Sequence, residues 1–170
     1  MLDRLSEQIQ PLDEAVERAA WADEAARRLM THPGVGPVVS LSYVLTIGDW
    51  QRFPRGKHVA SYIGLTPAEE SSSDKHRLGH IGKQGNTLLR CLLVEAAIHA
   101  QRSDASWHRQ YLRLSINKHH RVAKVAIAHK LAVRLYWMWR SEQDWREIKE
   151  RGSHAGQSGS PSGCTLKPRT

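Results

Sequence analysis

The sequence is poor in cysteine and has no long apolar run. Only two cysteines occur in 170 residues, Cys91 and Cys164. They form neither a metal-ligand spacing nor a disulfide framework, which argues against a disulfide-stapled secreted domain and fits a reducing cytoplasm. No segment approaches the roughly 20 apolar residues of a membrane-spanning helix, and the N-terminus lacks the apolar core of a signal peptide. We therefore expect a soluble, cytoplasmic protein with no membrane partner.

Positive charge is in excess. Lysine and arginine number 25 against 17 acidic residues, which gives a net charge of +8 and a pI near 9.9. Much of the excess lies in two clusters, Lys75–Arg77 with Lys83 and Lys118–Arg121 with Lys124. Clustered cations predict a polyanionic partner, nucleic acid rather than a membrane surface. A basic surface kept for solubility is the alternative.

The first 30 residues carry a regular apolar pattern. Apolar side chains alternate at spacings of three and four at Leu2, Leu5, Ile9, Leu12, Val16 and Ala19, which is typical of an amphipathic or coiled-coil helix. Pro11 lacks an N–H group and clashes with the preceding turn, so we expect a break near residue 10 and a longer helix ending near Met30. We expect residues 1–30 to form an arm that mediates homo-oligomerisation. A spacer from a further domain and an ordinary core helix are the alternatives.

The segment from His32 to Pro37 reads HPGVGP and predicts a tight turn between two helices. Pro37 suits the first helical position, which needs no N–H donor, and Gly48 can end that helix. A helix, a Gly-x-Gly turn and a second helix match the helix-hairpin-helix pattern. In that motif Gly34 and Gly36 would let backbone N–H groups approach a DNA phosphate. An αα-hairpin that needs glycine only for its geometry is the alternative.

The rest of the chain predicts an all-α fold, a helical bundle. The expected elements are a helix at Arg55–Ile63 ended by Gly64, a loop with room for a small hairpin at Leu65–Lys83, a helix at Thr87–Arg102 capped by Asn86, a shorter helix through Trp107 and Leu114 capped by Ser103 or Asp104, and a helix at Arg121–Arg140. The last is apolar nearly all round, which indicates the centre of a bundle. Residues 31–145 would form the main domain, and the Gly- and Ser-rich residues 146–170 a disordered tail.

The loop before Thr87 gathers hydroxyl groups and cations. Its serines and basic residues are Ser71, Ser72, Ser73, Lys75, His76, Arg77, His80 and Lys83. Hydroxyl groups among cations in front of a helix N-terminus suit the binding and attack of a phosphate. Serine runs in loops are more often solvated connectors, and the spacing fixes no base that would activate a serine. His76 and His80 lack an accompanying cysteine or carboxylate pattern, so no metal site is predicted.

Several motifs follow one another in a specific order: PGVGP, IGD, RF, YIGLTP, SSS, KxRLGxIxKxGN and LLxEAA. In this order they resemble the C-terminal transposase domain of the IS110/IS116 insertion-sequence transposases, over roughly Met30 to Arg140. The resemblance implies a site-specific DNA recombinase in which a serine attacks DNA and forms a covalent phosphoserine. The family's serine maps first onto Ser71 and second onto Ser72. It also implies that Arg77 and Lys83 hold the scissile phosphate.

The same resemblance indicates further partners and residues. DNA, both element ends and target, is the implied partner, and a guide RNA is a second candidate. The residues expected to bind nucleic acid are Gly34, Gly36, Lys75, Arg77, Lys83, Lys118, Arg121 and Lys124.

The sequence departs from the family pattern at three positions. Ser73 and Asp74 follow the two serines where glycine is usual, and Gly82 stands where serine or threonine is usual. Family members also carry an N-terminal RuvC-like domain whose acids bind Mg²⁺, and we expect this chain to lack it. No cofactor is then expected in this chain, Mg²⁺ is expected only with that domain, and the chain would be inactive alone. A catalytically inactive helix-hairpin-helix module that binds DNA or RNA, or a transposase remnant, is the alternative.

Overall fold

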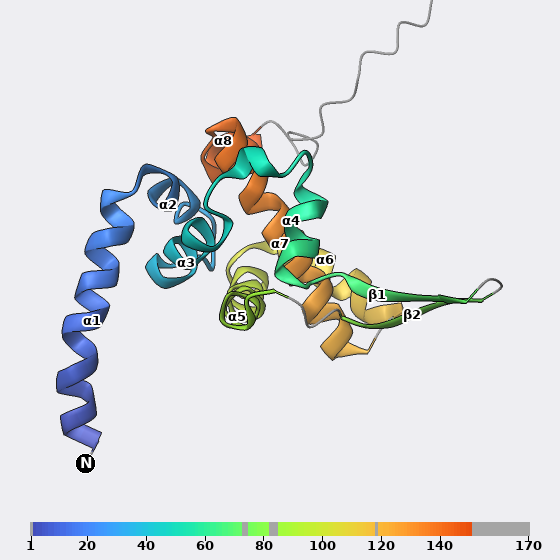
Figure 1. Cartoon of the computed structure of the whole chain (residues 1–170), viewed down its shortest axis with the longest axis horizontal. Coiled ribbons are helices and arrows are strands. Elements are labelled where there is room, and N and C mark those ends of the chain that lie inside the picture. Colours follow the sequence, from blue (N-terminus) through green and yellow to red (C-terminus); the bar gives the residue numbers. More distant parts are fainter. Residues whose placement is uncertain (1, 73–74, 82–84, 118, 151–170) are drawn as a thin grey trace, which may run out of the picture.

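The computed structural model describes residues 2–72, 75–81, 85–117 and 119–150 (Figure 1). In chain order the elements are α1 (Leu2–Ala22), α2 (Glu24–Leu29), α3 (Pro37–Ile47), the short 3-10 helix η1 (Trp50–Arg52), α4 (Gly56–Ile63), β1 (Pro67–Ser72), β2 (Lys75–Ile81), α5 (Thr87–Ser103), α6 (Ala105–Asn117), α7 (His120–Ser141) and α8 (Trp145–Glu150). The predicted all-α bundle is confirmed, with one antiparallel hairpin, β1–β2, where a small hairpin was allowed. None of the helices in the described ranges is long and apolar enough to cross a membrane.

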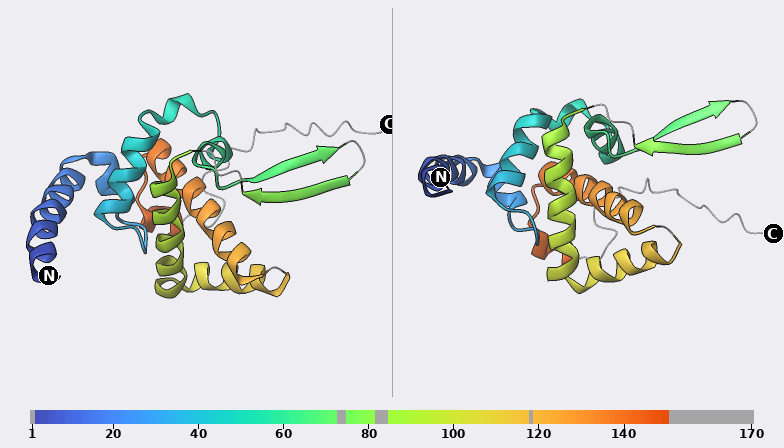
Figure 2. Two further views of the ribbon diagram at one scale, coloured as in Figure 1. Left: turned by 60° about the horizontal axis from the view of Figure 1, so that its bottom comes forward. Right: turned by 90° about the horizontal axis from the view of Figure 1, so that it is seen from below.

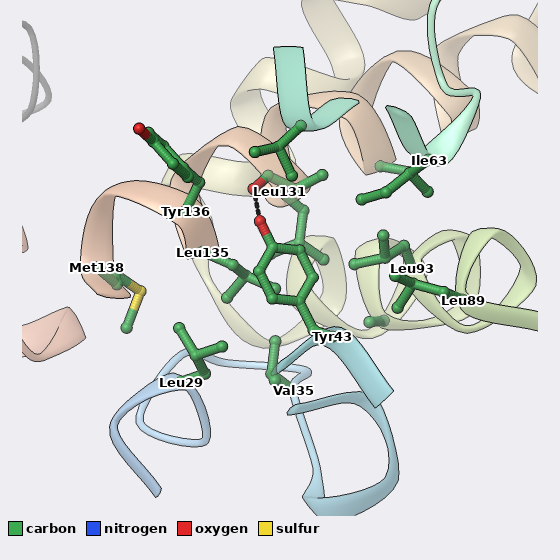
Figure 3. Packing of buried hydrophobic residues seen from close by; sticks show 14 of the residues in the cluster. Leu29, Val35, Tyr43, Ile63, Leu89, Leu93, Leu131, Leu135, Tyr136 and Met138 are labelled. Atoms are coloured by element: carbon green, nitrogen blue, oxygen red, sulfur yellow. Dashed lines mark hydrogen bonds between the residues drawn. The ribbon is translucent and has the colours of Figure 1, made fainter. Parts of the chain in front are cut away.

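Helix α7 forms the centre of the bundle. It packs against α2, α4, α5 and α6, and side chains along its length are fully buried, among them Leu131, Leu135 and Met138 (Figure 3). Burying one such side chain contributes about 1.5–3 kcal/mol. Neighbours on several sides explain why so much of this helix is apolar, and they confirm its predicted place at the centre of the bundle.

Two buried tyrosines tie other segments to α7. The Tyr43 hydroxyl of α3 donates to the Ala132 carbonyl at 2.7 Å (Figure 3). The Tyr136 hydroxyl of α7 donates to the Phe53 carbonyl and accepts from Arg140 Nη1 at 3.0 Å. Each phenol thus fills the core with its ring and satisfies its one polar group on a backbone carbonyl or a neighbouring cation.

The N-terminal helix differs from the prediction. Helix α1 runs through Pro11 without ending, so the break expected near residue 10 was wrong. Pro11 is exposed, and the carbonyl that loses its partner one turn earlier can bond to water. The helix is interrupted at Asp23 instead, where Oδ1 accepts the Ala26 N–H at 2.8 Å and caps α2.

Helix α8 closes the domain against the turn after α2. The Trp145 N–H donates to Thr31 Oγ1 at 3.0 Å, Ile148 is buried, and Lys149 Nζ lies 3.0 Å from Asp104 Oδ2. The helix includes residues 146–150, which the sequence predicted to belong to the disordered tail. Residues 151–170 lie outside the described part of the chain.

Replacing Tyr43 with phenylalanine tests the link between α3 and α7. Tyr43→Phe should lower the free energy of unfolding by about 0.5–1.5 kcal/mol, because the Ala132 carbonyl keeps its helical hydrogen bond and only the tyrosine's bond is lost. Urea denaturation measures the change, and an unaltered m-value would show that the native packing survives. Tyr62→Phe is the control, because Tyr62 is 43% exposed. An equal loss in both variants would contradict the assigned role of the Tyr43 hydroxyl.

Candidate nucleic-acid interface

The predicted serine nucleophiles lie on a hairpin that projects from the helical body (Figure 2). Strands β1 and β2 are antiparallel, and their register pairs Ser71 with His76, Ser72 with Lys75 and Glu70 with Arg77. Two of the predicted phosphate-binding cations therefore lie on the strand facing the serines. Ser73, Asp74, Gly82 and Lys83 lie outside the described residues.

The base of the hairpin is held against the end of α4. Gly64 ends α4 in the left-handed conformation, and the Leu65 N–H donates to the Ala60 carbonyl at 2.9 Å. On the returning side Gly85 has φ +96°, and a Cβ there would lie 2.3 Å from the Tyr62 carbonyl oxygen. Only glycine allows both this backbone conformation and this approach. Leu65, just before the hairpin, and Gly85, a few residues after it, thus both meet the last turn of α4.

Side chains at the start of α5 reinforce this base. Asn86 Oδ1 accepts the Leu89 N–H at 3.1 Å, which confirms the predicted N-cap, and Asn86 Nδ2 donates to Thr46 Oγ1 at 3.1 Å. The Arg90 guanidinium is buried and donates from Nη1 to the Ile63 carbonyl at 3.0 Å. Sequence reasoning missed Arg90, because an arginine on an amphipathic helix gives no sign that its partner is a carbonyl 27 residues earlier.

The two glycines of the predicted DNA-binding turn have different surroundings. Gly34 has φ +83°, and a Cβ there would lie 2.5 Å from the Ala100 N and 2.6 Å from the Ala96 carbonyl oxygen. Gly34 is therefore required for packing against α5. A Cβ at Gly36 would have no atom within 4 Å, and this residue is the N-cap of α3. Of the two, Gly36 has the open backbone that a phosphate contact requires.

His32 anchors the same turn from inside the protein. Its ring is 1% exposed, donates from Nδ1 to the Pro33 carbonyl at 2.8 Å, and packs against the rings of Trp107 and Trp145. The pKa of His32 is lowered to about 3, mainly by burial. The Pro33 hydrogen bond and the Asp104 charge oppose this lowering, and the Arg134 charge adds to it. The imidazole is neutral at physiological pH. The sequence suggested no role for this residue.

The turn and the hairpin lie at different ends of α5. Gly34 contacts Ala96 and Ala100, whereas the base of the hairpin lies beside Asn86 at the helix start. At 1.5 Å per residue, ten to fourteen helical residues separate the two regions by roughly 15–20 Å. The structure therefore does not bring Gly34 or Gly36 together with the serines.

The second basic cluster lies at the start of α7. His119 Nδ1 caps the helix by accepting the Arg121 N–H at 3.4 Å, and the His119 and His120 rings are 4.2 Å apart. Arg121 is exposed and Lys124 is half-buried. Lys118 lies outside the described residues. Across those residues, no group of three or more His, Cys, Asp and Glu side chains could hold a metal ion.

Comparison with known proteins identifies the family. The sequence profile of the transposase IS116/IS110/IS902 family matches residues 26–113, which is more than half of the chain. The chain belongs to this transposase family. The matched segment includes the glycine turn, the hairpin and α5, and it ends before α7.

Curated relatives agree with this assignment. A putative transposase (y4pF/y4sB) of Sinorhizobium fredii is 34% identical over 148 residues, 84% of this chain and 38% of the relative. The transposase for insertion sequence element IS1111A of Coxiella burnetii is 37% identical over 54% of this chain and 25% of its own length. That for IS1328 of Yersinia enterocolitica is 31% identical over 79% and 41%. This family member therefore spans at most about two fifths of these relatives.

The buried His32 predicts a loss of stability in acid. The pKa of His32 is about 3 in the folded protein and 6.5 in the unfolded chain. The unfolded chain therefore binds a proton at this residue before the folded protein does, and the free energy of unfolding falls as the pH drops from 6.5 towards 3, whereas it is unaffected by this group above pH 6.5. Between pH 7 and 4.5 this amounts to about 2–3 kcal/mol of unfolding free energy. Urea denaturation of wild type and His32→Phe at both pH values should show the larger fall in wild type. Parallel pH profiles would contradict the assignment.

The base of the hairpin predicts a contrast between two glycines. Gly85→Ala should lower the unfolding free energy by about 2–4 kcal/mol, because the new Cβ meets backbone and the positive φ is strained. Gly36→Ala is the matched control and should change it by less than about 1 kcal/mol, because its Cβ meets nothing. Thermal or urea unfolding of both variants checks this. Equal stabilities would show that Gly85 does not hold the hairpin base.

Proposed function

We propose that the chain is the C-terminal part of a DNA transposase, a site-specific recombinase in which a serine of β1 becomes joined to DNA. The observation that carries the proposal is the hairpin of this transposase-family chain. It projects from the body, and its register sets Ser71 opposite His76 and Ser72 opposite Lys75. Ser71 is the proposed nucleophile, and Ser72 is the second candidate.

The proposed chemistry is a transesterification at phosphorus. The serine hydroxyl oxygen attacks the phosphorus and forms a new P–O bond, while the bond to the departing strand's oxygen breaks and that oxygen takes up a proton. The number of phosphate ester bonds is conserved, so the strand can be rejoined without ATP. A base that accepts the serine proton lowers the barrier, and His76 is the residue that the register places across from Ser71. Arg77, with Lys83, would stabilise the charge that develops on the phosphate.

The remaining predicted residues would hold DNA away from the reacting bond. Gly36 lies at the N-terminus of α3, where the free backbone N–H groups of the first turn attract a phosphate. Arg121 and Lys124, with Lys118, would bind the backbone at the start of α7. In this proposal α2, the turn and α3 act as the helix-hairpin-helix.

The proposed partners and cofactor rest on the family to which the chain belongs. DNA ends and target are the proposed ligands, and a guide RNA is a second candidate for the α7 cluster. Mg²⁺ is proposed only for a RuvC-like domain outside this chain. We also propose that α1 joins two copies of the chain, which is supported by the exposure of Ile9 and Leu12 on this helix.

The test requires the chain joined to the N-terminal part of a full-length relative and DNA carrying both ends of its element. Mass spectrometry of trapped complexes should find DNA attached to Ser71. Ser71→Ala should reduce the adduct at least about 100-fold, because the nucleophile is lost, while duplex binding changes less than about twofold. Ser72→Ala is the matched control and should be the milder change.

The other possible results of this experiment each lead to a different conclusion about the serine. An adduct on Ser72 would correct the assignment of the nucleophile. Full recombination by the Ser71→Ala protein would exclude serine catalysis at this position. Binding with no adduct in any variant would favour the second candidate function, a DNA- or RNA-binding module without chemistry.

A further inference from the structure

The net charge of the protein comes from the segment that contains α6 and α7. Residues 105–141, which span α6 and α7, contain eight lysines and arginines and no aspartate or glutamate. The other 133 residues contain the remaining 17 basic residues and all 17 acidic residues, so they are neutral overall. The whole excess of +8 therefore lies within residues 105–141, and seven of these eight basic residues are on α6 or α7 themselves. A basic surface kept only for solubility would not need this separation.

The centre of this helix pair holds two cations close together. Lys130 of α7 donates from Nζ to Gln110 Oε1 of α6 at 3.1 Å, and Arg113 follows Gln110 by one turn of α6. Burial lowers the pKa of Lys130, and the Arg113 charge lowers it further. Among the described residues, the two ion pairs that form, Arg28–Glu24 and Lys149–Asp104, lie outside residues 105–141. Arg113 and Lys130 thus lie together without a carboxylate between them.

Two histidines of α7 also lie beside positive charges. Burial and then the Lys130 charge lower the pKa of His129. Partial desolvation, followed by the charges of His119, Lys124 and Arg121, lowers the pKa of His120. Both shifts disfavour additional positive charge, so an anion placed beside these groups would relieve a repulsion that the free protein retains.

We propose that the α6–α7 pair is a binding surface for a nucleic-acid backbone, with Arg113 and Lys130 at its centre. This deepens the proposed function, on which it rests for the nature of the ligand. From Arg121 to Lys130 the helix rises about 14 Å, which spans about four phosphates of one B-DNA strand. A phosphodiester chain supplies a regular row of single charges, which suits a row of cations without specific acidic partners.

The position of this surface is compatible with strand chemistry at the hairpin. The C-terminal end of α6 and the N-terminal end of α7 lie on the same side of the body as the β1–β2 hairpin, and α1 leaves from the other side (Figures 1 and 2). A duplex held on α6–α7 would therefore lie on the side of the molecule that carries the serines. The surface adds the α6 residue Arg113 and the mid-helix Lys130 to the cluster at the start of α7.

The test measures binding alone, with the full 170-residue chain. Fluorescence anisotropy follows a random 20-bp DNA duplex and a single-stranded RNA of equal length from about 50 to 300 mM NaCl. The double variant Arg113→Gln, Lys130→Gln should bind at least about tenfold more weakly at 100 mM NaCl. The slope of log K against log salt should become shallower by about two, because two phosphate contacts are lost.

Two further variants separate a local effect from net charge and from structure. Arg27→Gln, Lys57→Gln removes the same number of charges from exposed positions on α2 and α4 and should change the affinity less than about threefold. Arg113→Lys, Lys130→Arg exchanges the two cations and should keep the wild-type slope.

The outcomes decide the proposal independently of catalysis. A selective loss on duplex DNA or on RNA supports the surface and identifies its ligand. Equal losses in the α6–α7 variant and the α2–α4 control would overturn it, as would a loss of slope in the exchanged variant. No binding of either nucleic acid by the wild type would also overturn it and point to an acidic protein partner. Because no strand is cut in this assay, the result stands whether or not Ser71 forms an adduct.

Discussion

The burial of α7 is the constraint on which the rest of the structure depends. A 22-residue helix that carries apolar side chains along its whole length is stable in water only when neighbours cover them, and α2, α4, α5 and α6 provide that cover. The buried phenols of Tyr43 and Tyr136 then tie α3 and the segment after η1 to the same helix. The segments proposed to bind nucleic acid are therefore carried by a common core.

Helix α5 sets the spacing between the glycine turn and the hairpin, two of the segments proposed to act on nucleic acid. Its start supports the hairpin through Asn86 and Arg90, and its later turns accept the close approach of Gly34. In a helix the axial distance between two residues is set by their number, so the turn and the hairpin are held apart. A ligand that touched both would have to be extended, as a nucleic-acid duplex is. The charge on α6–α7 adds a third surface on the side to which the hairpin projects.

Local signals in the sequence located most elements. Asn86 predicted the start of α5 and Gly64 the end of α4, because caps act within one helical turn. Pro11 misled because its penalty depends on whether the carbonyl it displaces can reach water, which only the placement of α1 decides. The two glycines of the turn look equivalent in the sequence, but Gly34 packs against a helix more than 60 residues later and Gly36 faces open space.

The sequence by itself determined the helical class, the central place of α7, the excess of positive charge and the family resemblance. These properties depend on composition, periodicity and the order of motifs, all of which are written along the chain. Only the tertiary structure decided that His32 is a buried neutral imidazole, that Arg90 supports the hairpin from a distance, and that Lys130 lies beside α6 with Arg113 one turn away. Each of these depends on contacts between residues far apart in the chain, and burial and Coulomb energies follow distance in space rather than distance along the sequence.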